Sequence, residues 1–145
     1  MLEALSRVAF ERDVGRIDAR SARTYEWTII EASYPILDIV FNHARATPLR
    51  LRLTCTDWDE LPPSIELLDA VGKHLGTAPP NVGGVFNGGA HPSTGRPFVC
   101  MRGSREYHTH SSHTSDLWDN YRGKSGMDLA GIVFQLWRAW KRSVG

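Results

Sequence analysis

The sequence predicts a single α+β domain, residues 1–145, in which two helices flank an antiparallel sheet. Three features support this fold class: an N-terminal segment with helical spacing of apolar residues, three successive β-prone runs, and a capped amphipathic segment near the C-terminus. A chain of 145 residues, 41% of them hydrophobic, can enclose one core. We therefore expect an N-terminal helix, an antiparallel meander of three to four strands, a long loop and a C-terminal helix packed on the sheet.

The N-terminal segment is predicted to be an amphipathic helix, because its apolar residues recur three or four positions apart among charged ones. These residues are Leu2, Leu5, Val8, Ala9, Phe10, Val14 and Ile17. Three β-prone runs follow at residues 25–30, 36–41 and 49–56, separated by proline or polar segments. They predict the three strands of the meander.

The third run has the cleanest strand pattern. Leucines at positions 49, 51 and 53 alternate with arginines at 50 and 52. This alternation is typical of an antiparallel strand with one face in the core and one in water.

The segment after the third strand contains residues that interrupt regular secondary structure. The pair Pro62-Pro63 excludes helix and sheet interior alike, so the short apolar run that follows is either a fourth strand or a turn of helix. Residues 76–95 are rich in Gly, Pro, Asn and Ser. A stretch of this length inside a small domain indicates a functional loop.

The C-terminal segment predicts a helix that faces the core, because its apolar residues follow a helical stripe. The stripe consists of Leu129, Ile132, Val133, Leu136, Trp137 and Trp140. Residues 125–128, Ser-Gly-Met-Asp, resemble a capping box that starts at Ser125. Basic residues at positions 138, 141 and 142 suit the negative end of the helix dipole.

Composition limits the partners and the compartment. With 17 basic and 16 acidic residues, the net charge of +1 gives no reason to expect nucleic acid or a membrane surface as a partner. Two cysteines are too few for a disulfide scaffold, which favours a reducing compartment. Charges interrupt the apolar residues of the N-terminus, and no later run could span a bilayer. We expect a cytoplasmic protein.

Reactive side chains gather in residues 91–113, which hold four of the six histidines and one of the two cysteines. A thiol with nearby carboxylate and imidazole groups forms either a nucleophile with acid and base partners or a set of metal ligands. Cys100 is the thiol of this cluster. Cys55 ends a predicted strand, where a buried and inert thiol is expected.

The order of these features resembles the ubiquitin-conjugating enzyme family over most of the chain. His91-Pro92-Ser93 before Cys100 is similar to the family's His-Pro-Asn motif, residues 61–65 (Leu-Pro-Pro-Ser-Ile) to its proline-rich turn, and Trp118 to a family landmark. The resemblance implies a shortened fold of this family. It implies that Cys100 accepts a ubiquitin-like protein as a thioester from an activating enzyme and passes it to a target amine. Ser93 replaces the Asn that supports the oxyanion in the family.

A second resemblance concerns Cys100, Glu106, His108 and His110. This series is similar to a predicted metal-binding Cys-Glu-His-His domain found beside bacterial genes for ubiquitin-like proteins, activating enzymes and deubiquitinase-like peptidases. Together the two resemblances imply a bacterial conjugating enzyme of an antiphage operon. Its partners would be a ubiquitin-like protein, an activating enzyme, a target protein and a deubiquitinase-like peptidase.

Roles for the remaining residues follow from proximity in sequence. Arg96, Arg102 and Arg105 could lower the pKa of Cys100, and His108 or His110 could deprotonate an incoming lysine. The resemblance to the ubiquitin-conjugating family implies that His91, with Ser93, belongs to the active-site loop, where His91 would fix the backbone by hydrogen bonds. The side chains assigned to substrate positioning are Arg102, Glu106 and Trp118. Asp116 and Asp119 are expected to be solvated loop carboxylates.

The alternative is a zinc-binding module or metallohydrolase. Residues 106, 108 and 110 would lie on one side of an extended segment, with Cys100 or His113 as the fourth ligand. The ligand set would be Glu106, His108, His110 and His113 if Cys100 stays free for acyl transfer. Zinc suits such mixed ligands, whereas acyl transfer requires no cofactor.

Overall fold

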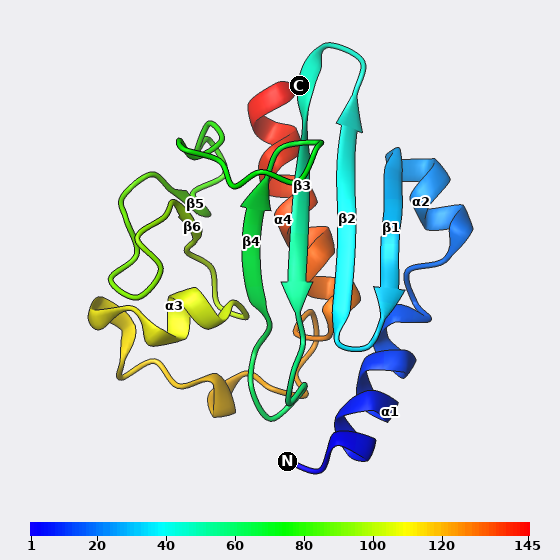
Figure 1. The fold of residues 1–145 in the computed structure, drawn as a ribbon, viewed down its shortest axis with the longest axis vertical. Helices are drawn as coiled ribbons and strands as arrows, with labels where there is room; N and C mark the ends of the chain where they lie inside the picture. Colours follow the sequence, from blue (N-terminus) through cyan, green and yellow to red (C-terminus); the bar gives the residue numbers. More distant parts are fainter.

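Four antiparallel strands follow one another along the chain and pair in the order β1-β2-β3-β4 (Figure 1). The computed structural model describes residues 1–145. The main sheet consists of β1 (Trp27–Ser33), β2 (Ile36–His43), β3 (Ala46–Thr54) and β4 (Ser64–Leu68). The predicted meander is confirmed, and the run after the paired prolines is its fourth strand.

Helices and a small ribbon complete the α+β fold. Two helices precede the sheet, α1 (Glu3–Val14) and α2 (Ala19–Tyr25). After β4 come the two-stranded ribbon β5 (Phe86–Asn87) and β6 (Phe98–Val99), the short helix α3 (Arg105–Thr109), the 3-10 turns η1 (Ser111–His113) and η2 (Trp118–Asn120), and α4 (Leu129–Val144). Figure 1 shows α4 crossing one face of the sheet, with α3 and the ribbon beside β4. The predicted fold class is confirmed.

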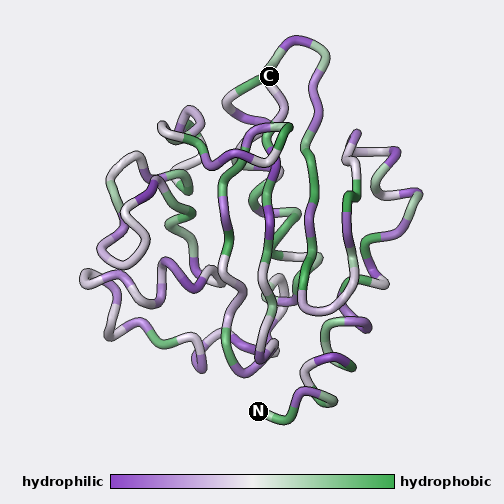
Figure 2. Tube along the Cα trace, in the orientation of Figure 1, coloured by the Kyte–Doolittle hydropathy of each residue, from purple (hydrophilic) through white to green (hydrophobic).

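The core lies between the sheet and α4. Leu49, Leu51 and Leu53 of β3 are at most 2% exposed and belong to one apolar cluster with Ile132 and Leu136 of α4. Figure 2 shows hydrophobic and hydrophilic residues alternating along the strands, as the predicted one-sided burial requires. The side chains that the pattern placed inward are therefore the ones that hold the sheet to the helix.

The outer face of the sheet carries an ion network. Asp38 is only 2% exposed. Its carboxylate accepts hydrogen bonds from Arg50 Nε at 2.9 Å and Arg52 Nε at 3.4 Å. The two arginines of β3 thus lie opposite the leucines, as predicted, and cover a carboxylate that would be costly to bury unpaired.

The N-terminal helix is shorter and less amphipathic than predicted. It ends at Val14, and three of its expected core residues, Leu2, Leu5 and Val8, are 72%, 58% and 65% exposed. The buried stripe contains Ser6, Ala9, Phe10 and Asp13. Ser6 Oγ accepts from the Tyr34 hydroxyl at 3.0 Å, and Asp13 Oδ2 accepts from Trp58 Nε1 at 2.9 Å. Polar residues with tertiary partners therefore occupy positions that periodicity assigned to apolar ones.

Two element boundaries also differ from the prediction. Tyr25 is the last residue of α2 rather than the start of a strand, and β1 begins at Trp27. Helix α4 is capped by Asp128, whose carboxylate accepts from Gly131 N at 2.8 Å, and not by Ser125. Asp128 can cap because its backbone is extended and directly precedes the first helical turn.

The glycine-rich segment is fastened to the domain. Gly83 packs so closely on α4 that a Cβ there would lie 2.6 Å from Ala139 Cα. Asn81 Oδ1 accepts from Phe86 N at 2.8 Å, and Val85 O accepts from Cys100 N at 2.7 Å. This loop therefore fixes the backbone position of Cys100.

Candidate functional site

Cys100 lies immediately after β6 and is half-buried. Its Sγ is 3.8 Å from His113 Nε2, within hydrogen-bond distance for sulfur. Cys55, in contrast, is fully buried, and burial raises the pKa of its thiol far above the ordinary value. Of the two thiols, only Cys100 combines access to solvent with a neighbouring imidazole.

The electrostatic surroundings of Cys100 do not favour the thiolate. Burial raises the pKa of its thiol, and a hydrogen bond with the Asn87 side chain acts in the opposite direction. Because Asn87 Oδ1 accepts from Gly89 N at 2.8 Å, its amide nitrogen remains to donate to sulfur. A base is therefore needed to form the thiolate near neutral pH.

The arginines predicted to lower the pKa of Cys100 bind elsewhere. Arg102 Nε donates to Asp116 Oδ2 at 3.0 Å. Arg105 donates to the carbonyl oxygens of Pro62 and Thr56, and an Arg96 guanidinium nitrogen lies 3.0 Å from a nitrogen of His74. None of the three contributes to the pKa shift of Cys100, so this prediction is wrong.

His113 is the imidazole that faces the thiol. It ends the 3-10 turn η1, and its ring stacks on Tyr107 with centroids 4.0 Å apart and an interplanar angle of 16°. The sequence suggested His113 only as a metal ligand. No spacing rule places a residue thirteen positions from Cys100 against it, because the intervening turn sets that contact.

His108 and His110, the predicted bases, are engaged in local structure. His108 Nδ1 lies 2.8 Å from Asp116 O and its Nε2 accepts from Gly103 N at 3.1 Å, which requires the neutral tautomer with hydrogen on Nδ1. Burial lowers the pKa of His108. His110 Nδ1 accepts from Ser112 N at 3.1 Å. His108 has no free nitrogen to serve as the predicted base.

His91 organises the backbone around the site. It is 2% exposed, its Nε2 donates to Glu106 O at 2.8 Å, and its Nδ1 accepts from Ser93 N at 3.0 Å. These bonds join the loop to α3 in the way expected of a structural histidine. Ser93 takes part through its backbone and is exposed on the loop.

Glu106 links α3 to the edge of the main sheet. Glu106 is 6% exposed, and its carboxylate accepts from Ser64 Oγ at 2.8 Å and Ile65 N at 2.9 Å. Burial raises the pKa of Glu106, while these two hydrogen bonds act in the opposite direction. Glu106 therefore completes the edge of β4 and does not face a substrate, contrary to its predicted role.

Replacing Glu106 with alanine should destabilise the protein by roughly 3 kcal/mol, because the buried Ile65 N–H would lose its acceptor and α3 its anchor. Urea unfolding followed by circular dichroism measures this change. Glu106→Gln is the matched control, since its amide oxygen can still accept from Ile65 N.

The wild type and Glu106→Gln should also differ in how their stability depends on pH. The raised pKa of Glu106 means that the folded state binds this proton more tightly than the unfolded state does. The resulting stabilisation of the wild type is complete below the ordinary value of 4.5 and is lost as pH rises through the raised pKa. The stability of Glu106→Gln relative to the wild type should therefore increase as the pH is raised. An equal change in the unfolding free energy of the two proteins would contradict this account.

Trp118 and Asp116 also differ from their predicted roles. Trp118 is 6% exposed, donates from Nε1 to Asp59 O at 2.8 Å and packs on Trp58, so it belongs to the core and is closed to substrate. Asp116 is not a free loop carboxylate, because Tyr107, Tyr121 and Arg102 all donate to it. Asp119 is exposed beside Arg122, as expected.

The predicted metal ligands do not converge. Residues 105–109 are helical and 111–113 form a 3-10 turn, so the extended segment that would align the ligands is absent. The carboxylate of Glu106 is bound to β4, and both nitrogens of His108 are bound to backbone. No three His, Cys, Asp or Glu side chains are arranged to hold a metal ion. The residues present do not fit a zinc site.

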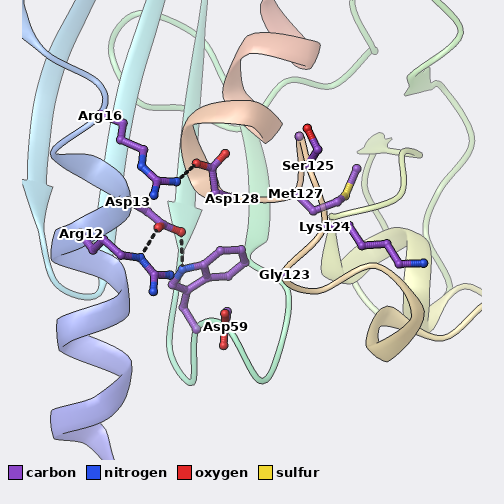
Figure 3. Close-up of a pocket in the computed structure, with 11 residues that line it drawn as sticks. Arg12, Asp13, Arg16, Asp59, Gly123, Lys124, Ser125, Met127 and Asp128 are labelled. Carbon is purple, nitrogen blue, oxygen red and sulfur yellow. Dashed lines mark hydrogen bonds and ion pairs between the residues drawn. The ribbon is translucent and has the colours of Figure 1, made fainter.

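A polar cavity of about 470 Å³ lies apart from Cys100, between α1, the β3–β4 loop and the segment before α4 (Figure 3). Its lining contains no cysteine and no histidine. Its charged side chains are largely paired with one another, Arg12 with Asp13 and Arg16 with Asp128. These carboxylates hold α1 to α4, so the cavity lacks the chemistry found at Cys100.

The fold and the site define an α+β protein with one accessible thiol beside an imidazole. A sequence model of the Y4jH-like family, described as the Y4jH family, matches residues 89–144, the part that holds Cys100, His113 and α4. Comparison with curated proteins finds no match. None of the helices combines the length and the apolar character that crossing a bilayer demands.

Proposed function

We propose that this protein is a cysteine-dependent acyl transferase of the ubiquitin-conjugating type. Cys100 would accept a ubiquitin-like protein as a thioester from an activating enzyme and pass it to an amine of a target, within a bacterial antiphage system that also includes a deubiquitinase-like peptidase. The observation that carries the proposal is the half-buried Cys100 thiol, 3.8 Å from the His113 imidazole. The order of helix, meander, His-Pro segment, cysteine and helix supports it.

In the first step, the Cys100 sulfur attacks the carbonyl carbon of the donor thioester. His113 takes the thiol proton, the new C–S bond forms, and the donor's C–S bond breaks to release a thiolate, which leaves with a proton. Because one thioester replaces another, the exchange needs no oxidant and is close to thermoneutral. The base is required since burial raises the pKa of the Cys100 thiol.

In the second step, a target amine attacks the thioester on Cys100. The C–N bond forms, the Cys100 C–S bond breaks, and His113 accepts the proton that the amine loses. Asn87, whose side chain opposes the rise of the Cys100 pKa, would supply an amide donor for the carbonyl oxygen of the thioester, where oxyanion charge develops. Asn87 would therefore stabilise the oxyanion, the role of the family's Asn that Ser93 replaces.

Reconstitution tests this function directly. The purified protein is incubated with ATP and with an activating enzyme and ubiquitin-like protein of the proposed antiphage system. We expect an adduct that thiol reductants release and that peptide mapping locates on Cys100. The Cys55→Ala protein should form the same adduct, because Cys55 is buried. A failure of the wild-type protein to form any adduct would overturn the proposal.

A further inference from the structure

The position of His113 depends on one aromatic side chain. The turn η1 that carries it is three residues long, and its neighbours Ser111, Ser112 and Thr114 are exposed. A surface imidazole in such a turn would sample several rotamers unless a contact restrains it. The stacked ring of Tyr107 supplies that contact, at 4.0 Å between centroids. The orientation of His113 toward Cys100 is therefore set largely by Tyr107.

Tyr107 is itself fixed at both ends. Its backbone N–H donates to Ser104 Oγ at 3.1 Å, and the same hydroxyl donates to Val99 O at 2.8 Å. Val99 directly precedes Cys100, so Ser104 ties the backbone of Tyr107 to the strand that carries the thiol. At the other end, the Tyr107 hydroxyl donates to Asp116 Oδ2 at 2.5 Å.

Asp116 is a fixed anionic anchor. It also accepts from Tyr121 at 2.5 Å and Arg102 at 3.0 Å. The hydrogen bonds from Tyr107 and Tyr121 hold the pKa of the Asp116 carboxyl well below its usual range, so it is ionised at neutral pH. An ionised acceptor strengthens its bond to the phenol and makes the ring a better partner for a protonated imidazole.

We propose that Tyr107 and Asp116 form a positioning unit that holds the His113 ring against Cys100 and stabilises its protonated form when it has taken the thiol proton. This inference rests on the proposed function, because His113 is the base of that mechanism. Neither residue forms a hydrogen bond with the sulfur, so both act through His113. The unit explains why a carboxylate in a surface loop has three donors.

Other groups near His113 are accounted for. His110 is the N-cap of the same turn, with its ring centroid 5.9 Å from that of His113, and the pKa of His108 in α3 is lowered mainly by burial and also by His113. Arg102 reaches the region through Asp116, which neutralises it. Tyr107 is the group that stacks on His113 face to face.

Alkylation of Cys100 by iodoacetamide tests the positioning unit without a ubiquitin-like protein. In a Cys55→Ala background, Tyr107→Leu should lower the alkylation rate at pH 7 about 10-fold, because the ring that orients the base is gone. The pH at which alkylation is half-maximal should rise, since protonated His113 would no longer be stabilised beside the thiolate. Tyr107→Phe keeps the stacked ring and loses only the anchor, so its effect should be about threefold.

Two controls separate positioning from loss of structure. Tyr121→Phe removes an equal hydrogen bond to Asp116 without touching His113, and it should change the rate less than about twofold. In a His113→Gln background, Tyr107→Leu should have no further effect, because the base it positions is absent. Full additivity of the two substitutions would overturn the inference even if the adduct forms. If the two substitutions are non-additive but the wild-type protein forms no adduct, only the proposed transferase function would be overturned.

Discussion

Replacing Cys100 with serine should reduce acyl transfer from the activating enzyme by roughly 10³-fold, because a hydroxyl is a far weaker nucleophile than a thiol beside a single imidazole. Any product that still forms would be an oxyester, which thiol reductants do not release but hydroxide does. Gel electrophoresis with and without reductant, followed by intact mass, measures both the amount and the chemistry of the adduct.

Cys55→Ser is the matched control for this substitution. It changes the same atom in a thiol that is fully buried in the core, with a pKa far above the ordinary value. The adduct should keep its rate and its sensitivity to reductant. A reductant-sensitive adduct that survives in the Cys100→Ser protein would show that Cys100 is not the acyl carrier.

Substituting glutamine for His113 should slow acyl transfer roughly 100-fold at pH 7, within the range expected for removal of a general base. The raised pKa of Cys100 keeps its thiol protonated at this pH, so the reaction depends on a nearby proton acceptor. As pH rises above the thiol pKa, solvent deprotonates Cys100 and the difference from the wild type should shrink. Single-turnover rates across a pH series measure the effect.

His110→Gln is the control for this second experiment, because the sequence analysis named His110, beside His108, as a candidate base and its ring lies close to His113. Its Nδ1 caps the 3-10 turn, and we expect less than about a threefold change in rate. If His113→Gln were equally slow at every pH, the substitution would have damaged the site, and His113 would not be the base.

Much of the fold could be predicted because its signals are local. The alternation of Leu49, Leu51 and Leu53 with two arginines defines β3, and the apolar stripe that begins at Leu129 defines α4. Such periods require only that one side of an element meets the core. The error in α1 arose because the polar Asp13 lies in its buried stripe, where its carboxylate binds Trp58 from a distant loop.

The reactive cysteine was also within reach of sequence analysis. Cys55 follows a core strand and Cys100 stands in a polar, histidine-rich segment, which predicts the difference in burial that the structure shows. The backbone hydrogen bonds of His91 were expected from the resemblance of the His-Pro segment to that of the ubiquitin-conjugating family. The side chains next to the Cys100 thiol could not be predicted from the sequence. Asn87 reaches it from the opposite strand of the ribbon, and His113 reaches it from a surface turn.

The sequence by itself determined the first and last helices, the three-stranded meander, their order and the single thiol open to chemistry, because these depend on periodicity and on local composition. Only the tertiary structure decided which histidine serves that thiol. His108 binds backbone, and Glu106 binds β4 across 42 residues of chain. His113 is the histidine that faces the sulfur. Contacts of this kind depend on the path of the chain in space, which spacing along the sequence does not encode.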